Sequence, residues 1–392
     1  MPGELRVLMV IDSLGRGGSE TSLATLAPYL PAVGVRLDVA YLHERDGVRA
    51  ELEAAGAAVH PALWRGDLAR SAWALGALVQ ELRPDLVHTT LFESDLTGRA
   101  AAVAGRVPVV TSLVNDSWSP AQRSEPGVRP WKVRTAQLLD AVTARSVVRF
   151  HALTREIARS VPPRLGVPAS RVEVVRRGRD EHRLGRRTPD RRAAARRSMG
   201  LDGDGPVVLA VGRQEHQKGF DVLLEAMAAL TGRWPGAVAV VAGREGNATP
   251  ALRQRVAALG LDDRVRFLGE RADVADLLCG ADVAAFPSRR EGMPGAVLEA
   301  MALEAPIVTT GTAAAREVLG DAPPALLVPV DDAAALAAAL ADTLAHPDAA
   351  AGRATAARRR FEDHFTIERV ADGMRDFYDH ALAATRWPAT RR

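Results

Sequence analysis

The sequence predicts an α/β protein built from two doubly wound domains. The chain has 392 residues, more than one hydrophobic core usually supports. Hydrophobic residues make up 47% of it, and short apolar runs alternate with longer Ala- and Leu-rich stretches. This alternation is typical of βαβ units around parallel sheets. Each half opens with an apolar run that leads into a glycine-containing loop, although the two halves are not copies of one another.

The N-terminal half contains six apolar runs that read as strands, at residues 6–11, 36–42, 85–89, 107–114, 149–154 and 172–175. A glycine loop with Gly17 and Gly18 follows the first run and opens a helix. We expect either a ligand loop or a simple tight turn there. Glu20 stands where a dinucleotide fingerprint has its third glycine, so NAD binding is not expected. These elements define a first domain, residues 1–180.

Arginines replace the apolar rhythm after residue 175, and we interpret residues 181–205 as an Arg-rich inter-domain region. A solvated linker and a contact with anionic lipid or a phosphorylated acceptor are its two alternative readings. Six more strands are predicted at residues 207–211, 238–242, 265–268, 283–286, 307–309 and 326–328. They define a second domain, residues 206–365. Apolar residues at helical spacing then predict a C-terminal helix within residues 366–392 that packs back on the first domain.

The composition excludes several classes of protein. Cys279 is the only cysteine, so an intramolecular disulfide and a multi-cysteine metal site are excluded. Histidines and carboxylates do not cluster, and we expect no metal and no cofactor. The absence of a long apolar run and of a signal-like N-terminus favours a cytoplasmic protein, with peripheral attachment to the membrane left open. A formal charge of +3 does not indicate nucleic acid binding, and the oligomeric state stays open.

Two cations lie on one predicted strand-to-helix loop. Arg213 and Lys218 follow the strand at residues 207–211. Because ligands of open α/β sheets bind at the carboxyl ends of the strands, both cations are placed for a diphosphate. Lys132 and Lys218 are the only lysines among 51 basic residues, a bias that suggests a GC-rich bacterial genome. A lysine retained against it indicates a compact ammonium for a phosphate oxygen.

Two glutamates flank a predicted helix start. Pro294 suits the first turn of a helix, which leaves Glu291 in the preceding loop and places Glu299 on the helix. A helix N-terminus binds phosphate through its free N–H groups, and carboxylates accept hydrogen bonds from sugar hydroxyls. Taken alone, the spacing also fits two solvated acids. Together with the cation loop it predicts a nucleotide-sugar site.

These motifs together resemble the large family of retaining glycosyltransferases with the GT-B fold, often called family 4 or group 1. The likeness covers nearly the whole chain and is strongest at residues 211–219, 264–269 and 291–302. It implies two Rossmann-like domains facing a cleft. The N-terminal domain would bind a hydroxyl acceptor, and the C-terminal domain would bind a UDP- or GDP-sugar. The likeness also implies a metal-independent transferase.

The resemblance assigns donor-side roles to particular residues. Arg213 and Lys218 would neutralise the diphosphate, Glu291 would hold the transferred sugar, and Glu299 would bind ribose hydroxyls. The small residues that would let backbone N–H groups approach the phosphates are Gly17, Gly18, Gly295 and Ala296. No enzyme nucleophile is implied.

The acceptor side departs from the family pattern. Asn115 and Asp116 stand where many members carry His-Asp, so the usual histidine is missing. His88, at the end of a predicted strand, resembles an acceptor-side position but also suits a structural histidine. The departures leave two alternatives: a catalytically degenerate sugar-nucleotide-binding protein, or an epimerase or synthase that uses the same donor.

Overall fold

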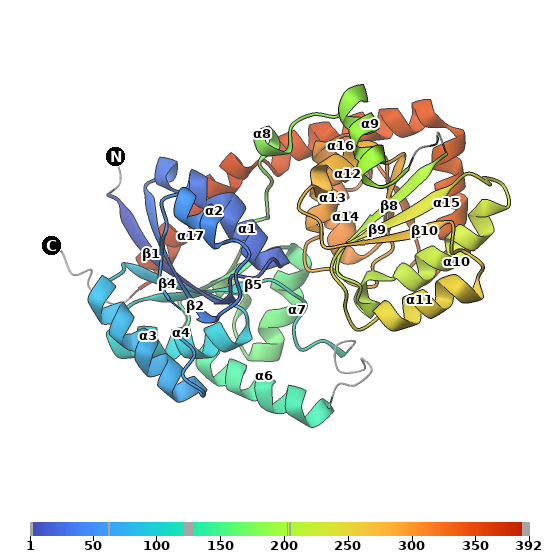
Figure 1. Cartoon of the computed structure of the whole chain (residues 1–392). Coiled ribbons are helices and arrows are strands. Elements are labelled where there is room, and N and C mark those ends of the chain that lie inside the picture. Colours follow the sequence, from blue (N-terminus) through green and yellow to red (C-terminus); the bar gives the residue numbers. More distant parts are fainter. Residues whose placement is uncertain (1–2, 62, 121–128, 202, 204, 386–392) are drawn as a thin grey trace. The chain divides into compact units, whose positions relative to one another are not determined.

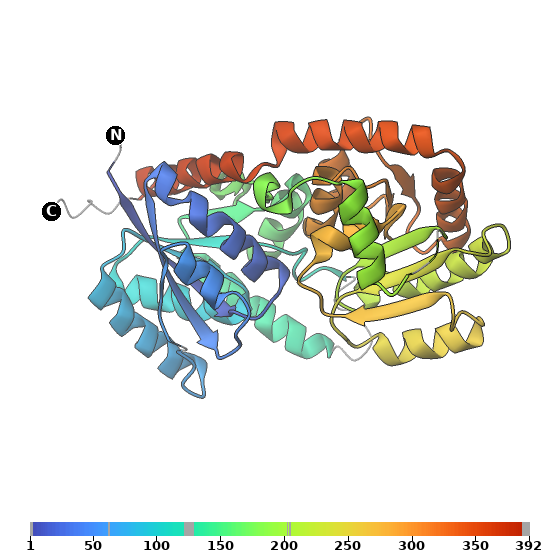
Figure 2. The same ribbon diagram turned by 45° about the horizontal axis from the view of Figure 1, so that its top comes forward.

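The computed structural model describes residues 3–61, 63–120, 129–201, 203 and 205–385. The chain forms two compact units. The first contains residues up to 178 together with those from 367 onward, and the second contains residues 179–366. In each unit, helices cover a parallel sheet (Figures 1 and 2).

The sheet of the first unit has seven parallel strands in the order β3-β2-β1-β4-β5-β6-β7. Their bounds are β1 Leu5–Ser13, β2 Val35–His43, β3 Ala58–Val59, β4 Leu86–Thr90, β5 Val109–Leu113, β6 Arg149–Ala152 and β7 Val172–Val174. Both β4 and β5 are buried along their whole length, as expected of central strands in a parallel sheet. The strand order reverses direction between β1 and β4.

Two layers of helices enclose this sheet. The helices of the first unit are α1 Gly18–Leu26, η1 Ala27–Tyr29, η2 Pro31–Val33, α2 Arg49–Ala54, α3 Leu68–Leu82, α4 Phe92–Gly105, α6 Pro130–Ala144, α7 Arg155–Leu165, η3 Ala169–Arg171 and α17 Ile367–Ala383. One layer is formed by α3, α4, α6 and α7, each packed against the next. On the other face, α17 packs against α1, and its Phe377 and Tyr378 are buried in the core below β1. Helix α17, which follows the second unit in the sequence, therefore completes the core of the first unit.

The sheet of the second unit has six parallel strands in the order β10-β9-β8-β11-β12-β13. Their bounds are β8 Val207–Val211, β9 Val238–Ala242, β10 Val265–Gly269, β11 Val283–Phe286, β12 Ile307–Thr310 and β13 Leu326–Val328. The helices are α8 Glu181–Leu184, α9 Pro189–Ser198, η4 His216–Lys218, α10 Phe220–Thr231, α11 Thr249–Ala258, α12 Val274–Gly280, α13 Gly295–Ala302, α14 Ala313–Leu319, α15 Ala333–Ala345 and α16 Pro347–His364. When the six strands of this sheet are numbered by their order along the chain, their spatial order is 3-2-1-4-5-6, the Rossmann arrangement.

The predicted α/β class with two doubly wound domains is confirmed. All twelve predicted strands are present, and β3, of only two residues, was not predicted. The predicted C-terminal helix is present as α17, and its proposed last residues, 386–392, lie outside the described part of the chain.

The interpretation of residues 181–205 as an inter-domain region needs correction. Within it, α8 and α9 belong to the second unit, where α9 packs against α12. Arg192 and Arg196 both contact the carboxylate of Asp282, at 2.6 and 2.5 Å, and Arg191 contacts Asp276 at 2.6 Å. These arginines anchor the segment because each finds a carboxylate on the unit's own surface.

Three further observations concern the described residues. They contain no helix that is long and apolar enough to cross a membrane. They contain no group of three or more His, Cys, Asp or Glu side chains placed to hold a metal ion. Cys279 is a free, buried thiol on α12.

Candidate active site

The sheet topology of the second unit brings the predicted donor residues to one edge. The strand order reverses between β8 and β11, and open α/β sheets bind their ligands at the carboxyl ends of the strands at such a switch point. The loop after β8 carries Arg213 and Lys218, and the loop after β11 carries Glu291. The structure therefore places these three residues on neighbouring loops at the switch point.

Lys218 and Glu291 form a direct ion pair. Nζ of Lys218 lies 2.7 Å from Oε1 of Glu291, and the hydroxyl of the buried Ser288 donates to the same oxygen at 2.7 Å. The side chains of Lys218 and Glu291 are mostly buried, with exposed fractions of 25% and 13%. This pairing holds a cation and a carboxylate beside one another at the carboxyl edge of the sheet.

Gly219 allows the loop after β8 to pack closely against the loop after β11. Gly219 ends the 3₁₀ turn η4 with φ +64°, and a Cβ there would lie 2.1 Å from the carbonyl oxygen of Pro287. The amide of Arg289 also donates to the carbonyl of Gln217 at 2.8 Å. The two loops are therefore joined through their backbones, and only glycine fits at position 219.

Arg213 is held less tightly than Lys218. Its Nε lies 3.1 Å from Oε1 of Glu215, and half of the side chain is exposed. Arg289, which the sequence analysis did not identify, contacts Asp221 and Asp331 at 2.6 Å each. Burial favours a raised pKa for Asp221, but the hydrogen bond and charge of Arg289 outweigh it and lower that pKa. Arg289 thus ties the loop after β11 to the start of α10 and to Asp331, which follows β13.

The start of α13 carries a cation that sequence reasoning missed. Pro294 is the N-cap of α13, so the helix begins one residue later than expected, and no side chain caps it. A Cβ on Gly295 would lie 2.1 Å from a guanidinium nitrogen of Arg179. Nε of Arg179 also donates to Oε1 of Glu299 at 2.7 Å. The free N–H groups of Gly295 and Ala296 therefore lie beside a guanidinium and a carboxylate.

Arg179 could not be singled out from the sequence, because it stands among the many arginines that follow residue 175. One signal was available. Gly295 follows a proline at a helix start, where the backbone itself does not require glycine, and this indicates close approach of another group.

Gly17 and Gly18 lie at the start of α1 in the first unit. Gly17 is the N-cap, and a Cβ on it would lie 2.5 Å from a carboxylate oxygen of Glu20. A Cβ on Gly18 would lie 3.4 Å from a nitrogen of Arg177. Glu20 therefore folds back over the N-terminus of α1. This helix end already faces a carboxylate, which makes it a poorer phosphate site than the start of α13.

His88 belongs to a buried hydrogen-bonded chain that joins β4 to α17. Its Nδ1 lies 2.9 Å from the hydroxyl of Tyr378, and its Nε2 lies 2.8 Å from the hydroxyl of Ser112. Ser112 also contacts Nδ1 of His151 at 2.8 Å, and Nε2 of His151 donates to the carbonyl of Val175 at 2.7 Å. Burial lowers the pKa of His88 well below its ordinary value and that of His151 to about 4.

With both imidazoles neutral, the direction of this chain is fixed. The Val175 carbonyl can only accept, so Nε2 of His151 carries the proton and its Nδ1 accepts from Ser112. Nε2 of His88 then donates to Ser112, and Nδ1 of His88 accepts from Tyr378. Both ring nitrogens of His88 thus have structural partners. The residue also lines a cavity of about 80 Å³ between α1 and α17.

Asn115 and Asp116 follow β5 and differ in their surroundings. Asn115 is exposed. Asp116 accepts from the hydroxyl of Ser160 at 2.9 Å and from Arg164 at 2.6 Å, which ties it to α7. Trp118, two residues on, adopts φ +63°. A bulky residue with positive φ stores strain, which persists only where other contacts fix the segment.

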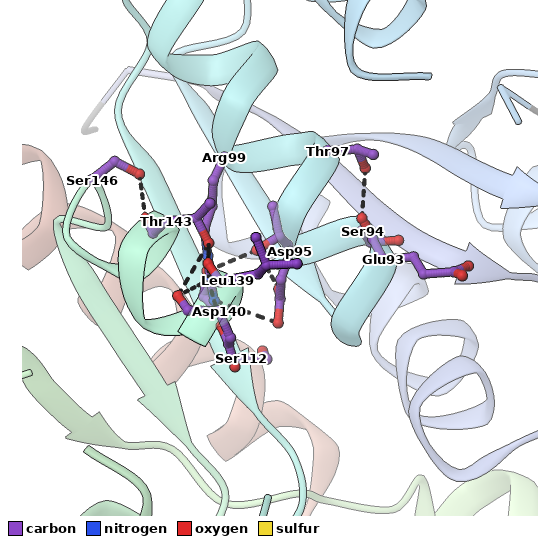
Figure 3. A network of polar contacts seen from close by, with 12 residues as sticks. Glu93, Ser94, Asp95, Thr97, Arg99, Ser112, Leu139, Asp140, Thr143 and Ser146 are labelled. Carbon is purple, nitrogen blue, oxygen red and sulfur yellow. Dashed lines mark hydrogen bonds and ion pairs between the residues drawn. The ribbon is translucent and has the colours of Figure 1, made fainter. Parts of the chain in front are cut away.

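A buried polar network provides those contacts (Figure 3). Arg99 of α4 is 1% exposed, and its Nη1 lies 2.6 Å from Oδ1 of Asp140 on α6. The other carboxylate oxygen of Asp140 accepts from the indole N–H of Trp118 at 2.8 Å. Asp95 lies 3.5 Å from Arg99, and burial raises its pKa to about 7 although Arg99 opposes the rise. The network holds the segment that carries Asn115.

Other polar groups at this edge were not predicted. Glu93 at the start of α4 contacts His43, and the neighbouring Ser94 donates its N–H and hydroxyl to Asp12 at 2.8 and 2.7 Å. Leu91, which joins β4 to α4, has φ +77°. A leucine in this conformation is strained, a feature found often at functional sites. Nothing in the local sequence signals these contacts, because the partners lie 50 and 82 residues apart.

Comparisons with known proteins identify the family. The model described as "Glycosyl transferase 4-like domain" matches residues 17–178, and the model described as "Glycosyl transferases group 1" matches residues 205–346. Two relatives named D-inositol 3-phosphate glycosyltransferase are 32% identical to the chain. The match to the Saccharomonospora viridis protein covers 63% of this chain and 56% of the relative. The match to the Salinispora arenicola protein covers 76% and 69%.

A solved structure shows the fold. HepE of Anabaena, crystallised in complex with UDP-glucose, superposes with a TM-score of 0.84 over 96% of this chain and 100% of its own, at 22% identity. The likeness confirms the predicted GT-B fold. Both sequence models fit their respective halves, and the Salinispora relative is covered over more than two thirds of its length. The chain therefore belongs to the group 1 glycosyl transferases, with a glycosyl transferase 4-like N-terminal domain.

Proposed function

We propose that this protein is a retaining, metal-independent glycosyltransferase that transfers a sugar from a UDP- or GDP-sugar to a hydroxyl acceptor. The observation that carries the proposal is the Lys218–Glu291 pair at the switch point of the second sheet, in the same unit as the uncapped start of α13. A nucleotide-sugar needs cations and N–H groups for its phosphates and carboxylates for its hydroxyls. The UDP-glucose bound by HepE makes a UDP-sugar the first donor to test.

Each donor-side residue receives a role from its contacts. Lys218 and Arg213 neutralise the diphosphate, and the N–H groups of Gly295 and Ala296 bind a phosphate. Both contacts of the Glu291 carboxylate described above use Oε1, so we assign Oε2 to a hydroxyl of the transferred sugar. Glu299 binds the ribose through the oxygen that Arg179 does not use.

Arg179 adds a third cation that the sequence did not predict. Its guanidinium stacks over Gly295 while it holds Glu299, so it orients the ribose carboxylate and adds positive charge at the start of α13. Three cations oppose the charge of a diphosphate. For this reason the proposed reaction needs no divalent metal.

The chemistry is a same-face displacement without an enzyme nucleophile. The bond between the anomeric carbon and the diphosphate oxygen breaks as the acceptor oxygen forms its bond to that carbon. The acceptor's hydroxyl proton passes to the departing diphosphate. Negative charge grows on the diphosphate during this step, and Arg213 with Lys218 stabilises it more in the transition state than in the ground state.

The acceptor is assigned to the first unit. The carboxyl edge of its sheet presents Glu93 with His43, Asp12 with Ser94, and the exposed Asn115, a set that can hydrogen-bond a polyol. Asn115 cannot take a proton, which agrees with a diphosphate that acts as the base. The names of the relatives make D-inositol 3-phosphate the first acceptor to test, ahead of lipid-linked and polysaccharide acceptors.

The experiment measures thermal stabilisation and nucleotide release with UDP-, GDP-, ADP- and dTDP-sugars, with and without EDTA. We expect one donor to raise the melting temperature and to be consumed when acceptor is added, in EDTA as well. Lys218→Ala should weaken the stabilisation and slow the consumption on the order of 100-fold. Arg253→Ala removes an exposed cation from α11 and is the matched control, which should behave as the wild type.

Two outcomes contradict the proposal. Loss of transfer in EDTA that Mg²⁺ restores would overturn metal independence. Stabilisation by a donor that is never consumed, with any acceptor or with water, would identify a catalytically degenerate binding protein instead. Product analysis by NMR distinguishes retention from inversion at the anomeric carbon.

A further inference from the structure

One layer of helices in the first unit carries a concentration of exposed apolar side chains. The described residues contain seven large hydrophobic side chains that are exposed, and six of them lie on α3, α4 and α6. These helices pack side by side on one face of the sheet (Figure 1). We call this surface the outer apolar face; its members are Trp73, Val103, Trp131, Leu138, Leu139 and Val142.

The pattern is sharpest on α6. Trp131, Leu138 and Val142 are spaced by seven and four residues, so they form one stripe along the helix, and they are 63%, 64% and 62% exposed. The opposite side of α6 carries Asp140 and Ala144, which are buried. One side of α6 therefore packs on α4, and the opposite side presents an apolar stripe to the outside.

Cations flank this stripe on both sides. At 100° per residue, Arg134 and Arg145 lie on one side of the stripe, and Lys132 lies on the other next to Leu139; all three cations are exposed. The one acidic residue on α6, Asp140, is buried and already paired with Arg99. The exposed surface of α6 thus combines apolar side chains with positive charge and carries no carboxylate among its described residues.

A hollow continues this surface beyond the end of α6. It has a volume of about 550 Å³, and Arg145, Arg149 and Arg171 line it together with Ser146 and Ser170. Arg145 belongs both to the flank of the stripe and to the hollow, so the two features are continuous. Glu173 lies 3.6 Å from Arg149 and offsets part of the charge, which leaves an excess of two cations. Guanidinium and hydroxyl groups in this arrangement suit a phosphate.

We propose that the outer apolar face docks onto a membrane surface that contains anionic phospholipid. The stripe of α6 enters the boundary between head groups and acyl chains, where Trp131 suits the interface, while the flanking cations meet lipid phosphates. A second copy of this chain fits less well, because cations flank the stripe on both sides and would face cations of the other copy across a symmetric interface. The proposal rests on exposure and charge in the first unit and is independent of the donor chemistry.

The test is flotation of the full chain with vesicles of phosphatidylcholine alone and of phosphatidylcholine with phosphatidylglycerol, at low and at 0.5 M salt. We expect binding to the anionic vesicles that weakens at high salt. Leu138→Ser/Val142→Ser should lower it by on the order of tenfold or more. Lys132→Gln/Arg134→Gln should lower it about 25-fold, at about fivefold for each cation. All four side chains are exposed, so folding should persist.

Matched controls separate the surface from general effects. Val330→Ser removes the exposed hydrophobic side chain that lies in the second unit, and Arg253→Gln/Arg255→Gln removes two exposed cations from α11. Both should float as the wild type does. Unchanged flotation of Leu138→Ser/Val142→Ser, or equal binding to both vesicle types, would overturn the proposal. Concentration-dependent dimers that this variant abolishes, without vesicle binding, would assign the face to a second copy instead.

Discussion

Acidification should destabilise the first unit through the buried His151. An imidazole that is neutral in the folded protein and has a pKa lowered to about 4 resists protonation, whereas in the unfolded chain it accepts a proton near 6.5. The stability linked to this residue is therefore complete above pH 6.5 and is lost as the pH falls toward 4. Proton linkage lowers the free energy of unfolding by about 2 kcal/mol between pH 7 and pH 5, and by about 3 kcal/mol between pH 7 and pH 4.

The contacts explain why the loss is not avoided by rearrangement. A proton on Nδ1 of His151 would face the hydroxyl proton of Ser112, so that hydroxyl would have to turn away. If it turned toward His88, it would meet the N–H of Nε2, which is also a donor. The whole chain from Tyr378 to Val175 then loses a bond or leaves the interior. His88 itself has a lowered pKa and adds to the effect in the same direction.

The assay is urea unfolding at pH 7, 6 and 5, followed by tryptophan fluorescence, since Trp64, Trp73, Trp118 and Trp131 all report on the first unit. His151→Gln keeps a donor toward Val175 but cannot titrate, so its stability should fall less between pH 7 and pH 5 by about 2 kcal/mol. His346→Gln removes an exposed imidazole and should follow the wild type. Equal losses in the wild type and in His151→Gln would refute the reasoning.

Three other predictions concern the two units. Lys218→Ala should lower kcat on the order of 100-fold, because the cation acts on charge that develops in the proposed transition state, and it should also lower the melting temperature, because it leaves the mostly buried Glu291 without its cation; steady-state kinetics measures the rate, and an unchanged kcat would contradict the role. Gly219→Ala should cost at least about 2 kcal/mol in urea unfolding, whereas Gly260→Ala, with a similar φ but open space around its Cβ, should cost about 1 kcal/mol; equal costs would rule out the clash with Pro287. Arg99→Met should lower stability by about 3–5 kcal/mol, because it leaves two buried carboxylates without their cation, and a neutral effect in the same assay would show that the network is not needed.

The sequence by itself determined the α/β class, the strands and the loops that follow them. Strands such as Val207–Val211 are continuous apolar runs, because a parallel sheet is buried on both faces and each strand carries its own signal. The loops of the proposed donor site were equally visible. Arg213, Lys218 and Glu291 stand at fixed distances from their strands, and the carboxyl ends of parallel strands meet at one edge, so local sequence was enough to place them there.

The tertiary structure alone decided which side chains are partners. Arg179 looked like one arginine among many, yet it reaches Glu299 across 120 residues of chain. His88 looked like an acceptor-side residue, and only the return of α17 gave it Tyr378 as a partner 290 residues away. The Arg-rich stretch looked like a linker until Asp276 and Asp282 came beside it. Such pairings depend on which loops and helices the fold brings together, and a local pattern carries no information about a partner that is distant in the chain.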